Sequence, residues 1–473
     1  MTDNKDDVLD VSSMLDSYEE QPINIDPKES PVSPVENRSN ENRSHSPRPP
    51  MRTQRPHRDS RGDSRNDSRS DSRDGHRDNG DQTQPRNEDN GAPSEDRLKE
   101  DLKLSYTAIG VLDVTVGGYG FLRQDYTINP NKDIYVSTSQ IRRFWLRRGD
   151  MVEGLARPPK EGERFHSLLL IKKINGVELT EEESRQRNNF DKLTSLHPNR
   201  MIKLETKPDI MSTRILDLIA PIGFGQRALL VSQPKAGKTT FLKEIAEAIS
   251  INHPKAILMA VLIGERPEEV TEIKRFIGGE VAASNFDESP RQQVKVANLA
   301  LERAKRLVEM GNDVVILLDS ITRLARAFNL SVVGTGRSMS GGFDPSALFP
   351  AKKFLGAARN NEEGGSLTII GTTLVDTESR MDNLIYEEFK GTGNMEVHLD
   401  RKFAERRIFP AIDIEKSGTR HEELLFDEKM MKKINTLHRM LGLLNPEERL
   451  TLLTDKLNKT KSNDEFLATL NVS

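Results

Sequence analysis

The chain has 473 residues, no cysteine and a formal net charge of −4. This length accommodates two or three domains, each able to bury its own core. The lack of cysteine excludes disulfides, thiol catalysis and cysteine-ligated zinc, and it is typical of proteins of a reducing cytosol.

The N-terminus is acidic and lacks the basic and apolar regions of a signal peptide, and apolar runs such as 256–263 are too short to span a bilayer. We therefore expect a soluble, cytoplasmic protein. The net charge averages acidic, mixed and basic stretches, so it gives no direct information about nucleic-acid binding.

Residues 1–104 are predicted to be a disordered, low-complexity tract, because they are poor in aromatic and branched apolar residues and rich in Asp, Ser, Arg, Asn and Pro. The triplet Asp-Ser-Arg recurs every four residues from Asp59 to Arg73. This pattern is typical of a solvated spacer; the alternative is an arginine-bearing tether that adds salt-sensitive affinity for RNA.

Between residues 105 and 179, short alternating segments are divided by Gly, Pro and Asn turns, which predicts a small β-barrel with strands that include 109–114, 133–136 and 167–171. Tyr119 and Phe121 are two residues apart in a glycine-rich strand, hence on one face and about 6 to 7 Å apart. Two nucleic-acid bases would stack there, with Arg123 and the basic pair 142–143 contacting phosphates and Tyr135 adding a ring. Aromatic residues on strands also form cores, so that alternative stays open.

A polar connector at 180–207 leads to residues 208–473, where buried-strand runs alternate with helical patterns before a helical C-terminus. The expected strands are 227–232, 256–263, 313–318 and 366–371, and a long helix is expected over 292–310. This alternation predicts a parallel sheet with helices on both faces. Ser462 and Glu465 are expected to form a capping box for the last helix.

A phosphate-binding loop is predicted at 232–239, where Ser-Gln-Pro-Lys-Ala-Gly-Lys-Thr follows an apolar strand and opens a helix. In such loops backbone N–H groups wrap the phosphates, the lysine, here Lys238, reaches the β- and γ-phosphates, and the hydroxyl, here of Thr239, binds Mg²⁺. Ser232 stands where the usual pattern has its first glycine, and Gly-Lys-Thr alone also occurs in ordinary strand-to-helix turns.

Two carboxylates follow neighbouring strands, at the edge where open parallel sheets bind ligands. Asp319 is placed to hold the hydration shell of Mg²⁺, and Glu265 is placed to polarise an attacking water. Taken singly, Asp319 would also serve as a helix N-cap and Glu265 as a surface carboxylate. Arg407 and Arg420 are candidates for a cation that reaches the γ-phosphate from an adjacent subunit, with surface salt bridges as the alternative.

In chain order, the segments 119–123, 133–137, 140–144, 158–164, 234–239, 265–270, 319–323 and 386–394 resemble motifs of the bacterial transcription termination factor Rho family. The resemblance runs from about Tyr106 to the C-terminus. It implies an OB-fold (cold-shock-like) RNA-binding domain followed by an α/β, RecA-type P-loop ATPase domain, in a homohexameric ring with ATP at the subunit boundaries. The implied activity is RNA-stimulated ATP hydrolysis with Mg²⁺, driving a 5′-to-3′ RNA/DNA helicase that pulls transcripts from RNA polymerase.

The resemblance also implies site residues at matching positions. The primary RNA site would comprise Gly118, Tyr119, Gly120, Phe121, Leu122, Arg123, Asp133, Ile134, Tyr135, Glu163, Arg164 and Phe165. The site inside the ring would comprise Ser338, Met339, Ser340, Gly341, Gly342 and Arg380. Nucleotide contacts would come from Gly223, Phe224, Gly225, Gln226, Arg227, Ala228, Lys235, Ala236, Gly237, Lys238, Thr239, Thr240 and Arg266, with Phe409 near the adenine. Glu265 would activate water and Arg420 would act in trans. The chain departs from the family's usual residues at Tyr119, Phe165, Gly264 and Arg380.

Two other classes of protein stay open. A proton-driven or secretion-linked rotary ATPase shares the RecA-like core but has no need of an aromatic barrel face, and RNA-independent turnover would favour it. A passive RNA-binding scaffold that senses ATP would bind nucleotide without releasing phosphate.

Overall fold

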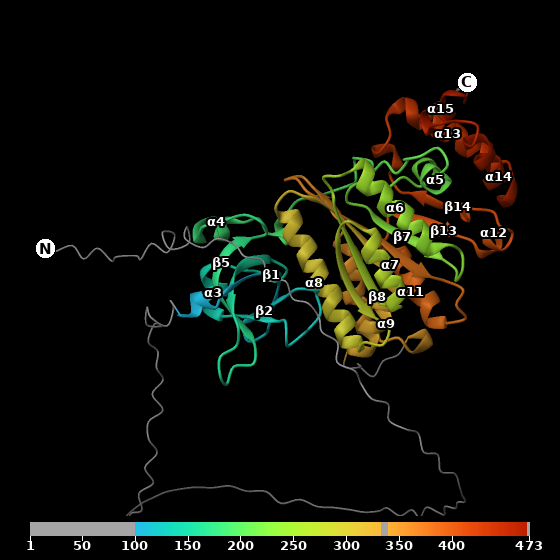
Figure 1. The fold of residues 1–473 in the computed structure, drawn as a ribbon. Helices are drawn as coiled ribbons and strands as arrows, with labels where there is room; N and C mark the ends of the chain where they lie inside the picture. Colours follow the sequence, from blue (N-terminus) through green and yellow to red (C-terminus); the bar gives the residue numbers. More distant parts are fainter. Residues whose placement is uncertain (1–99, 333–338, 471–473) are drawn as a thin grey trace, which may run out of the picture. The chain divides into compact units, whose positions relative to one another are not determined.

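The computed structural model describes residues 100–332 and 339–470 (Figure 1). The expectations for residues 1–99, and for Ser338 in the ring-interior site, lie outside the described residues. The expected disorder is wrong for residues 100–103, which are helical, because Asp101 pairs with Lys160 at 2.6 Å and lies 3.5 Å from Arg157. No helix in the described part of the chain is long and apolar enough to cross a bilayer.

Residues 106–174 form a closed barrel with the strand order β1-β2-β3-β5-β4. Its elements are β1 (Tyr106–Val114), β2 (Gly120–Arg123), β3 (Ile134–Val136), α3 (Thr138–Arg143), β4 (Met151–Arg157) and β5 (His166–Ile174). All pairings are antiparallel except that of β3 with β5. The expected strands at 109–114, 133–136 and 167–171 are confirmed as parts of β1, β3 and β5, and a small closed barrel of this kind is typical of OB-folds.

The barrel interior is filled by alternate residues of each strand, among them Leu112, Leu122, Ile134 and Val152. Because side chains alternate between the two faces of a strand, the residues between these point out of the barrel. The core pattern therefore fixes which side of β2 and β3 is left for ligands.

A connector containing α4 (Glu181–Gln186), η1 (Phe190–Lys192) and β6 (Ser195–Leu196) leads to the second domain. Its sheet has the order β14-β13-β7-β12-β10-β8-β9, with β11 pairing with β12 and β6 at one side. The strands are β7 (Arg227–Ser232), β8 (Ile257–Glu265), β9 (Glu280–Asn285), β10 (Asp313–Asp319), β11 (Arg359–Asn361), β12 (Ser366–Leu374), β13 (Met395–Leu399) and β14 (Ile412–Thr419). The pairings from β13 to β9 are parallel, as expected, and β14 runs antiparallel to β13.

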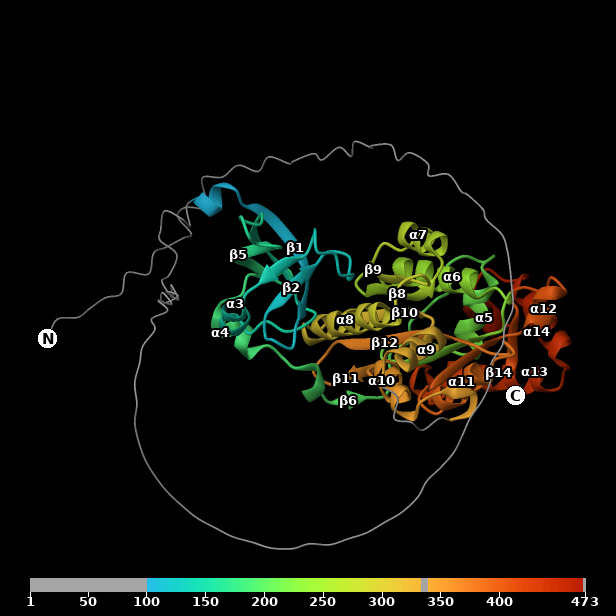
Figure 2. The ribbon, with the colours of Figure 1, turned by 90° about the horizontal axis from the view of Figure 1, so that it is seen from below.

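Helices cover both faces of this sheet, as the alternating pattern predicted (Figure 2). One face packs against α5 (Met211–Ile219), α6 (Lys238–Asn252), α7 (Pro267–Phe276) and the C-terminal helices α13 (Glu428–Gly442), α14 (Pro446–Leu457) and α15 (Asn463–Ala468). The other packs against α8 (Pro290–Glu309), α9 (Ile321–Ser331), α10 (Pro345–Gly356) and α11 (Arg380–Lys390). Shorter elements are η2 (Ser340–Gly342), α12 (Arg401–Glu405) and η3 (Glu422–Leu424).

The last helix has half of the expected capping box. Ser462 accepts a hydrogen bond from the backbone N of Glu465. The Glu465 carboxylate, however, accepts from the backbone N of Lys461 at 2.7 Å, one residue before the N-cap. The helix is therefore capped as predicted, while the reciprocal bond is shifted by one residue.

A buried arginine fastens the C-terminal helices to α5. The side chain of Arg214 is fully buried and donates to the carbonyls of Pro208, Leu457 and Thr460 and to Oδ1 of Asn463. Glu205 lies 3.5 Å away and offsets its charge. Because a buried cation is tolerated only when paired and hydrogen-bonded, this network makes the C-terminal bundle dependent on one side chain.

The Arg214→Met variant should be destabilised by about 3 kcal/mol or more, since methionine removes the buried cation that faces the Glu205 charge and a donor to three backbone carbonyls. The measurement is the urea midpoint, together with limited proteolysis of the C-terminal helices. Arg439→Met, at an exposed position of α13, is the matched control and should behave like the parent. Equal midpoints for both variants would contradict the role given to Arg214.

Candidate nucleotide and RNA sites

The predicted phosphate loop joins the carboxyl end of β7 to the start of α6. The backbone reaches the left-handed region at Lys235 (φ 68°) and again at Gly237 (φ 95°), after which α6 begins at Lys238. Nothing lies within 4 Å of a Cβ placed on Gly237, so glycine is favoured here by conformation rather than by space. A cavity of about 400 Å³ is lined by residues 232–235 and 237–240 together with Leu374. The free N–H groups of a helix N-terminus make such a cavity suited to phosphate.

Lys238 lies between the two predicted carboxylates. Its Nζ is 2.6 and 2.7 Å from the two oxygens of Asp319 and 3.5 Å from Oε1 of Glu265. Glu265 and Asp319 are only 2 % and 1 % exposed. Two buried acids side by side repel each other and lose hydration, and the lysine charge between them offsets part of this cost.

Two further side chains, which the sequence did not indicate, complete this cluster. Thr372 donates to Oδ1 of Asp319 at 2.7 Å, and Arg323 lies 3.3 Å from Oε2 of Glu265. Thr372 stands at the carboxyl end of the expected strand 366–371, so the rule that found Glu265 and Asp319 would also have found it. Arg323 is on the first turn of α9, and no periodicity relates it to Glu265.

Burial raises the pKa of Glu265 to about 7. Repulsion from Asp319 acts in the same direction, while Lys238 and Arg323 oppose it. A carboxyl group that titrates near neutral pH is suited to take a proton from water, which is the property expected of a general base.

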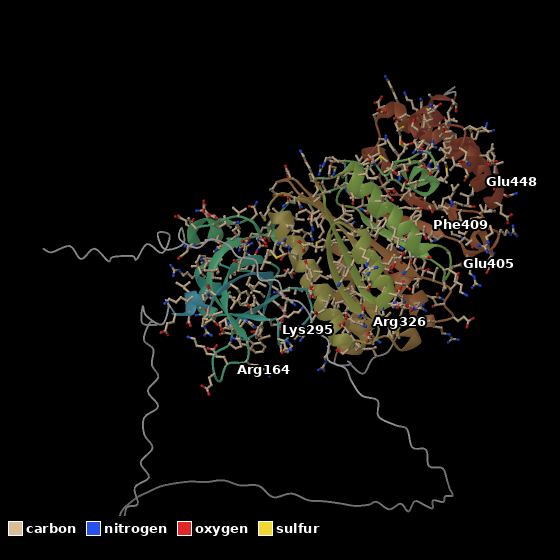
Figure 3. All side chains as sticks on the ribbon, in the orientation of Figure 1. Arg164, Lys295, Arg326, Glu405, Phe409 and Glu448 are labelled. Carbon is tan, nitrogen blue, oxygen red and sulfur yellow. The ribbon has the colours of Figure 1, made fainter. Side chains whose placement is uncertain are left out.

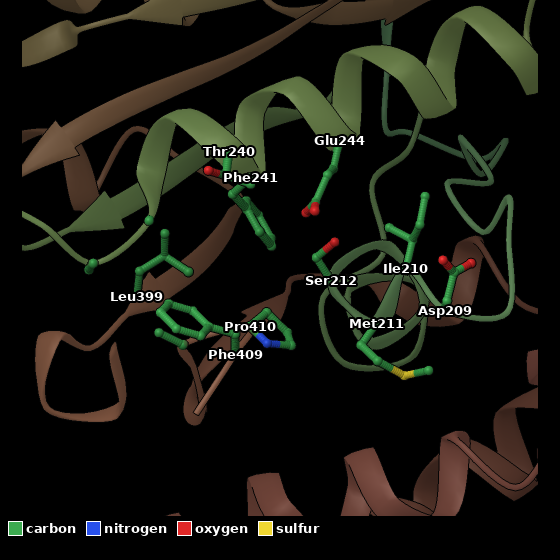
Figure 4. A pocket seen from close by; sticks show the side chains of 13 residues that line it. Asp209, Ile210, Met211, Ser212, Thr240, Phe241, Glu244, Leu399, Phe409 and Pro410 are labelled. Atoms are coloured by element: carbon green, nitrogen blue, oxygen red, sulfur yellow. The ribbon is translucent and has the colours of Figure 1, made fainter. Parts of the chain in front are cut away.

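A second cavity, of about 490 Å³, adjoins the phosphate cavity and shares Gly237 and Thr240 with it. Figure 4 shows Phe409 and Phe241 pointing toward the same space, with Ser212 and Glu244 farther along. Phe409 is 53 % exposed although it is apolar, which leaves its ring available to stack on a planar ligand. The other residues that line this second cavity include Asp209, Ile210 and Met211, which no sequence motif indicated.

The two arginine candidates lie at opposite ends of the sheet. Strand pairing places Ser232 level with Leu399 and Ile412, so Arg407 and Phe409, just before β14, lie at the phosphate-loop end. The same register places Ala228 level with Met395 and Thr419, so Arg420 lies at the other end, about 15 Å away along the strands.

The segment Gly223–Arg227 also lies at the Arg420 end of β7. The backbone N of Asn394 bonds to the carbonyl of Arg227, and its carbonyl bonds to the backbone N of Arg420. The residues predicted to contact the nucleotide therefore fall into two groups. Residues 235–240 and Phe409 lie at the phosphate-loop end of the strands, while residues 223–227 and Arg420 lie at the opposite end. The two groups cannot contact one nucleotide within a single chain. Arg266, the N-cap of α7, is exposed beside Glu265.

Four aromatic rings gather on the outer face of the barrel. The centroids of Tyr119 and Phe121 are 5.8 Å apart, Tyr135 is 5.8 Å from Tyr119 and 6.1 Å from Phe121, and Phe165 is 4.8 Å from Phe121. These are the rings of the predicted stacking face. Arg164, labelled in Figure 3, is exposed on the adjoining loop, and Glu163 there pairs with Arg157 at 2.6 Å.

Arg123 does not have the exposed position expected for a phosphate contact. It is 6 % exposed, pairs with Asp133, and lies 3.5 Å from Asp113. Its guanidinium also stacks over Phe121, with Cζ 4.9 Å from the ring centroid. The correction is that Arg123 and Asp133 support the stacking face from beneath. Leu122 and Ile134 point into the core and offer only main chain.

The two loops predicted for the ring interior lie together. A Cβ on Gly341 (φ 76°) would lie 2.7 Å from the backbone N of Met381 and 3.2 Å from the carbonyl carbon of Arg380. Only glycine allows this approach without displacing the start of α11. Met339, Gly341, Gly342 and Arg380 therefore form one surface of the chain.

An aromatic-faced OB barrel beside a P-loop domain with paired acids defines the class of RNA-dependent ATPases. Residues 108–180 match the family profile "Rho termination factor, RNA-binding domain", and residues 212–419 match "ATP synthase alpha/beta family, nucleotide-binding domain". The chain is 55% identical over 363 residues to transcription termination factor Rho of Bacillus subtilis (strain 168), covering 76% of this chain and 84% of that protein. With Rho of Aquifex aeolicus it shares 52% over 381 residues, covering 79% and 87%. The chain belongs to the transcription termination factor Rho family.

The sequence resemblance is thus confirmed, and the barrel match decides against a rotary ATPase. Among solved structures, the chain is similar to an ATPase of a bacterial type III secretion system, with a TM-score of 0.49 and 23% identity over 59% of this chain and 86% of that one. The assembled secretion ATPase EscN has the same TM-score at 22% identity, over 65% of this chain and 76% of that one.

Acidification through pH 7 should reduce ATP hydrolysis. Glu265 must be ionised to accept a proton, and its raised pKa means that the protonated form dominates below about 7, so kcat/KM should fall about tenfold per pH unit below that value. The measurement is the pH profile of RNA-stimulated phosphate release between pH 5.5 and 8.5. The Glu265→Gln variant should lack this acidic limb, and a flat parent profile would contradict the assignment.

Replacing Phe121 with alanine should weaken capture of single-stranded RNA by about 1 to 3 kcal/mol, the contribution of one stacked base. The measurement is a fluorescence titration with a short pyrimidine oligoribonucleotide in the absence of ATP. Ile109→Ala, which removes an exposed apolar side chain of the same barrel, is the control and should leave affinity unchanged. Equal affinities of the two variants would show that the rings do not stack on RNA.

Proposed function

We propose that the chain is one subunit of a homohexameric ring that hydrolyses ATP at its subunit boundaries and moves 5′ to 3′ along single-stranded RNA. The supporting observation is the separation of Arg420 from the phosphate loop of its own chain. An arginine that neutralises the γ-phosphate must approach it closely, so Arg420 is assigned to the nucleotide of the adjacent subunit. Arg407, at the phosphate-loop end, is assigned to the periphery of its own site.

Each residue of the nucleotide site then has one role. Lys238 leaves Asp319 and Glu265 for the β- and γ-phosphates, and residues 235–240 supply backbone donors. Phe409 stacks on the base. Glu265 accepts the proton of the attacking water, and Arg266, exposed next to it, faces the same phosphates.

The oxygens of Thr239 and Asp319 fit Mg²⁺. This ion keeps several waters and takes one or two protein oxygens together with substrate phosphates, and the Asp319 carboxylate faces the lysine beside the phosphate cavity. When bound, the ion neutralises charge on the phosphates. The hydrogen bond from Thr372 holds the Asp319 carboxylate in place for this contact.

The helix α9 links this site to the ring-interior loops. It starts directly after Asp319, and Asn329, near its other end, binds the carbonyl of Gly342 and the backbone N of Asp344. Arg326, labelled in Figure 3, pairs at 2.7 Å with Asp382 of α11. Asp382 lies two residues after Arg380, which belongs to the predicted ring-interior site. We assign to α9 the transmission of nucleotide state to the loops that grip RNA.

The division of labour follows the chain: a low-complexity tract at 1–104, an RNA-capturing OB domain at 105–179, a connector at 180–207 and the motor at 208–473. The RNA polymerase elongation complex is the proposed target, because it holds the nascent transcript that the ring would pull. Such a target places the protein in the cytoplasm, which fits a chain without cysteine.

The test is phosphate release by the purified protein with and without a pyrimidine-rich RNA strand. The parent should release phosphate faster with RNA. Lys238→Ala should lower release more than about 100-fold, because the transferring phosphate loses its cation, while RNA binding at the barrel stays within about twofold. Lys255→Ala, at an exposed turn, is the control. Equal release with and without RNA, or normal hydrolysis by the Lys238 variant, would refute the proposal.

A further inference from the structure

Asn394 lies in the turn between α11 and β13, at the Arg420 end of the sheet. Its Oδ1 accepts hydrogen bonds from the backbone N of Arg227 at 2.9 Å and from Nε2 of Gln226 at 2.7 Å. Its carbonyl accepts from the backbone N of Arg420 at 2.9 Å, and its backbone N donates to the carbonyl of Arg227 at 3.0 Å. One residue therefore joins the start of β7, the start of β13 and the end of β14.

These bonds fix the backbone that carries Arg420. On its other side, Thr419 donates from Oγ1 to the carbonyl of Pro221 at 2.6 Å. The side chain of Arg420 is exposed, and within residues 100–332 and 339–470 its guanidinium has no hydrogen bond or ion pair. A held backbone with an unengaged guanidinium is suited to meet a ligand that this chain does not itself supply.

The surroundings of Arg420 favour an anion. Arg227 is anchored through Nε to the carbonyl of Thr392 at 2.9 Å and through Nη1 to that of Ala358 at 3.2 Å, and so needs no carboxylate. Burial lowers the pKa of Arg227, and the charges of Arg359 and Arg420 lower it further. Arg359 and Arg420 thus both lie within electrostatic reach of Arg227, an arrangement that a polyphosphate would relieve.

We propose that Asn394 is a positioning residue that holds Arg420 at the angle required by the nucleotide of the adjacent subunit. This inference rests on the proposed trans role of Arg420. The critical atom is Oδ1, which accepts from the backbone N of Arg227 at 2.9 Å and from Nε2 of Gln226 at 2.7 Å. Gln226 also donates to the Asn394 carbonyl, but at the longer distance of 3.2 Å. Small misplacements of a catalytic group are costly, since a shift of about 1 Å reduces rates about 100-fold.

The location of Asn394 separates this role from nucleotide binding in its own chain. Asn394 precedes β13, which pairs with the start of β7, while the phosphate loop follows the other end of β7. Asn394→Ala should therefore lower kcat about 10- to 100-fold and leave the affinity of its own phosphate loop for ATP unchanged. Asn435→Ala, at an exposed position of α13, is the matched control and should keep the parental kcat.

The decisive experiment mixes subunits before ring assembly and measures RNA-stimulated phosphate release. Lys238→Ala subunits lack a working phosphate loop but keep Arg420 and Asn394, whereas Asn394→Ala subunits have the opposite defect. Where an Asn394→Ala subunit presents its nucleotide to the Arg420 of a Lys238→Ala neighbour, the site is intact. Random equal mixing makes about a quarter of the sites intact. The mixture should therefore release phosphate faster than the mean of the two variants measured separately.

A parallel mixture of Lys238→Ala with Arg420→Ala tests the premise separately. If that mixture recovers activity and the Asn394→Ala mixture does not, Asn394 acts elsewhere and the inference is overturned. If neither recovers, Arg420 does not act in trans and the proposed function itself fails. A parental kcat for Asn394→Ala would also overturn the inference.

Should Asn394→Ala fail to assemble, Asn394→Asp replaces it in the same mixtures. Aspartate keeps an oxygen that accepts from Gln226 and Arg227 but adds a negative charge to the turn whose carbonyl binds the backbone N of Arg420, which should hold the guanidinium back. Its kcat should fall and be recovered by Lys238→Ala subunits. The inference is overturned if mixing with Lys238→Ala subunits does not raise the kcat of Asn394→Asp, while the mixture of Lys238→Ala with Arg420→Ala does recover activity.

Discussion

In a parallel sheet all strands end at the same edge, and this single constraint arranges the chemistry of the chain. It brings the phosphate loop after β7, Glu265 at the end of β8 and Asp319 at the end of β10 to one side. Strand β14, which runs antiparallel to its neighbour β13, carries Arg420 to the opposite side. In the proposed ring, each subunit would thus contribute to two sites, and assembly would be a condition of catalysis.

The acids at this edge exist at an electrostatic cost that Lys238 offsets. Both are nearly inaccessible to water, and without a nearby cation one would take up a proton. In the proposed mechanism, nucleotide binding draws Lys238 away from Asp319 toward phosphate oxygens, and so changes the electrostatic field on Glu265 when a base is needed.

Sequence patterns predicted those parts of the fold that local physics determines. The strands that end at Gly-Lys-Thr, Glu265 and Asp319 are predicted by their apolar runs and by the polar residues at their ends. The stacking face is predicted by the two-residue spacing of Tyr119 and Phe121. Contacts between distant segments leave no such trace. The second cavity needs Asp209–Ser212 to meet Phe409, and Asn394 reaches both β7 and β14. For Arg123 the local signal was misleading, because a basic residue beside aromatic rings looks like a phosphate contact until Asp133 is found beneath it.

The buried pairing of Arg123 also affects how the barrel responds to ionic strength. Because Arg123 is already paired with carboxylates, it releases no counterions from the RNA when RNA binds. Each phosphate that is not neutralised makes the slope of log affinity against log salt concentration shallower by about 0.7. In the proposed capture of RNA by the four rings, the salt dependence therefore comes from exposed cations such as Arg164 rather than from Arg123.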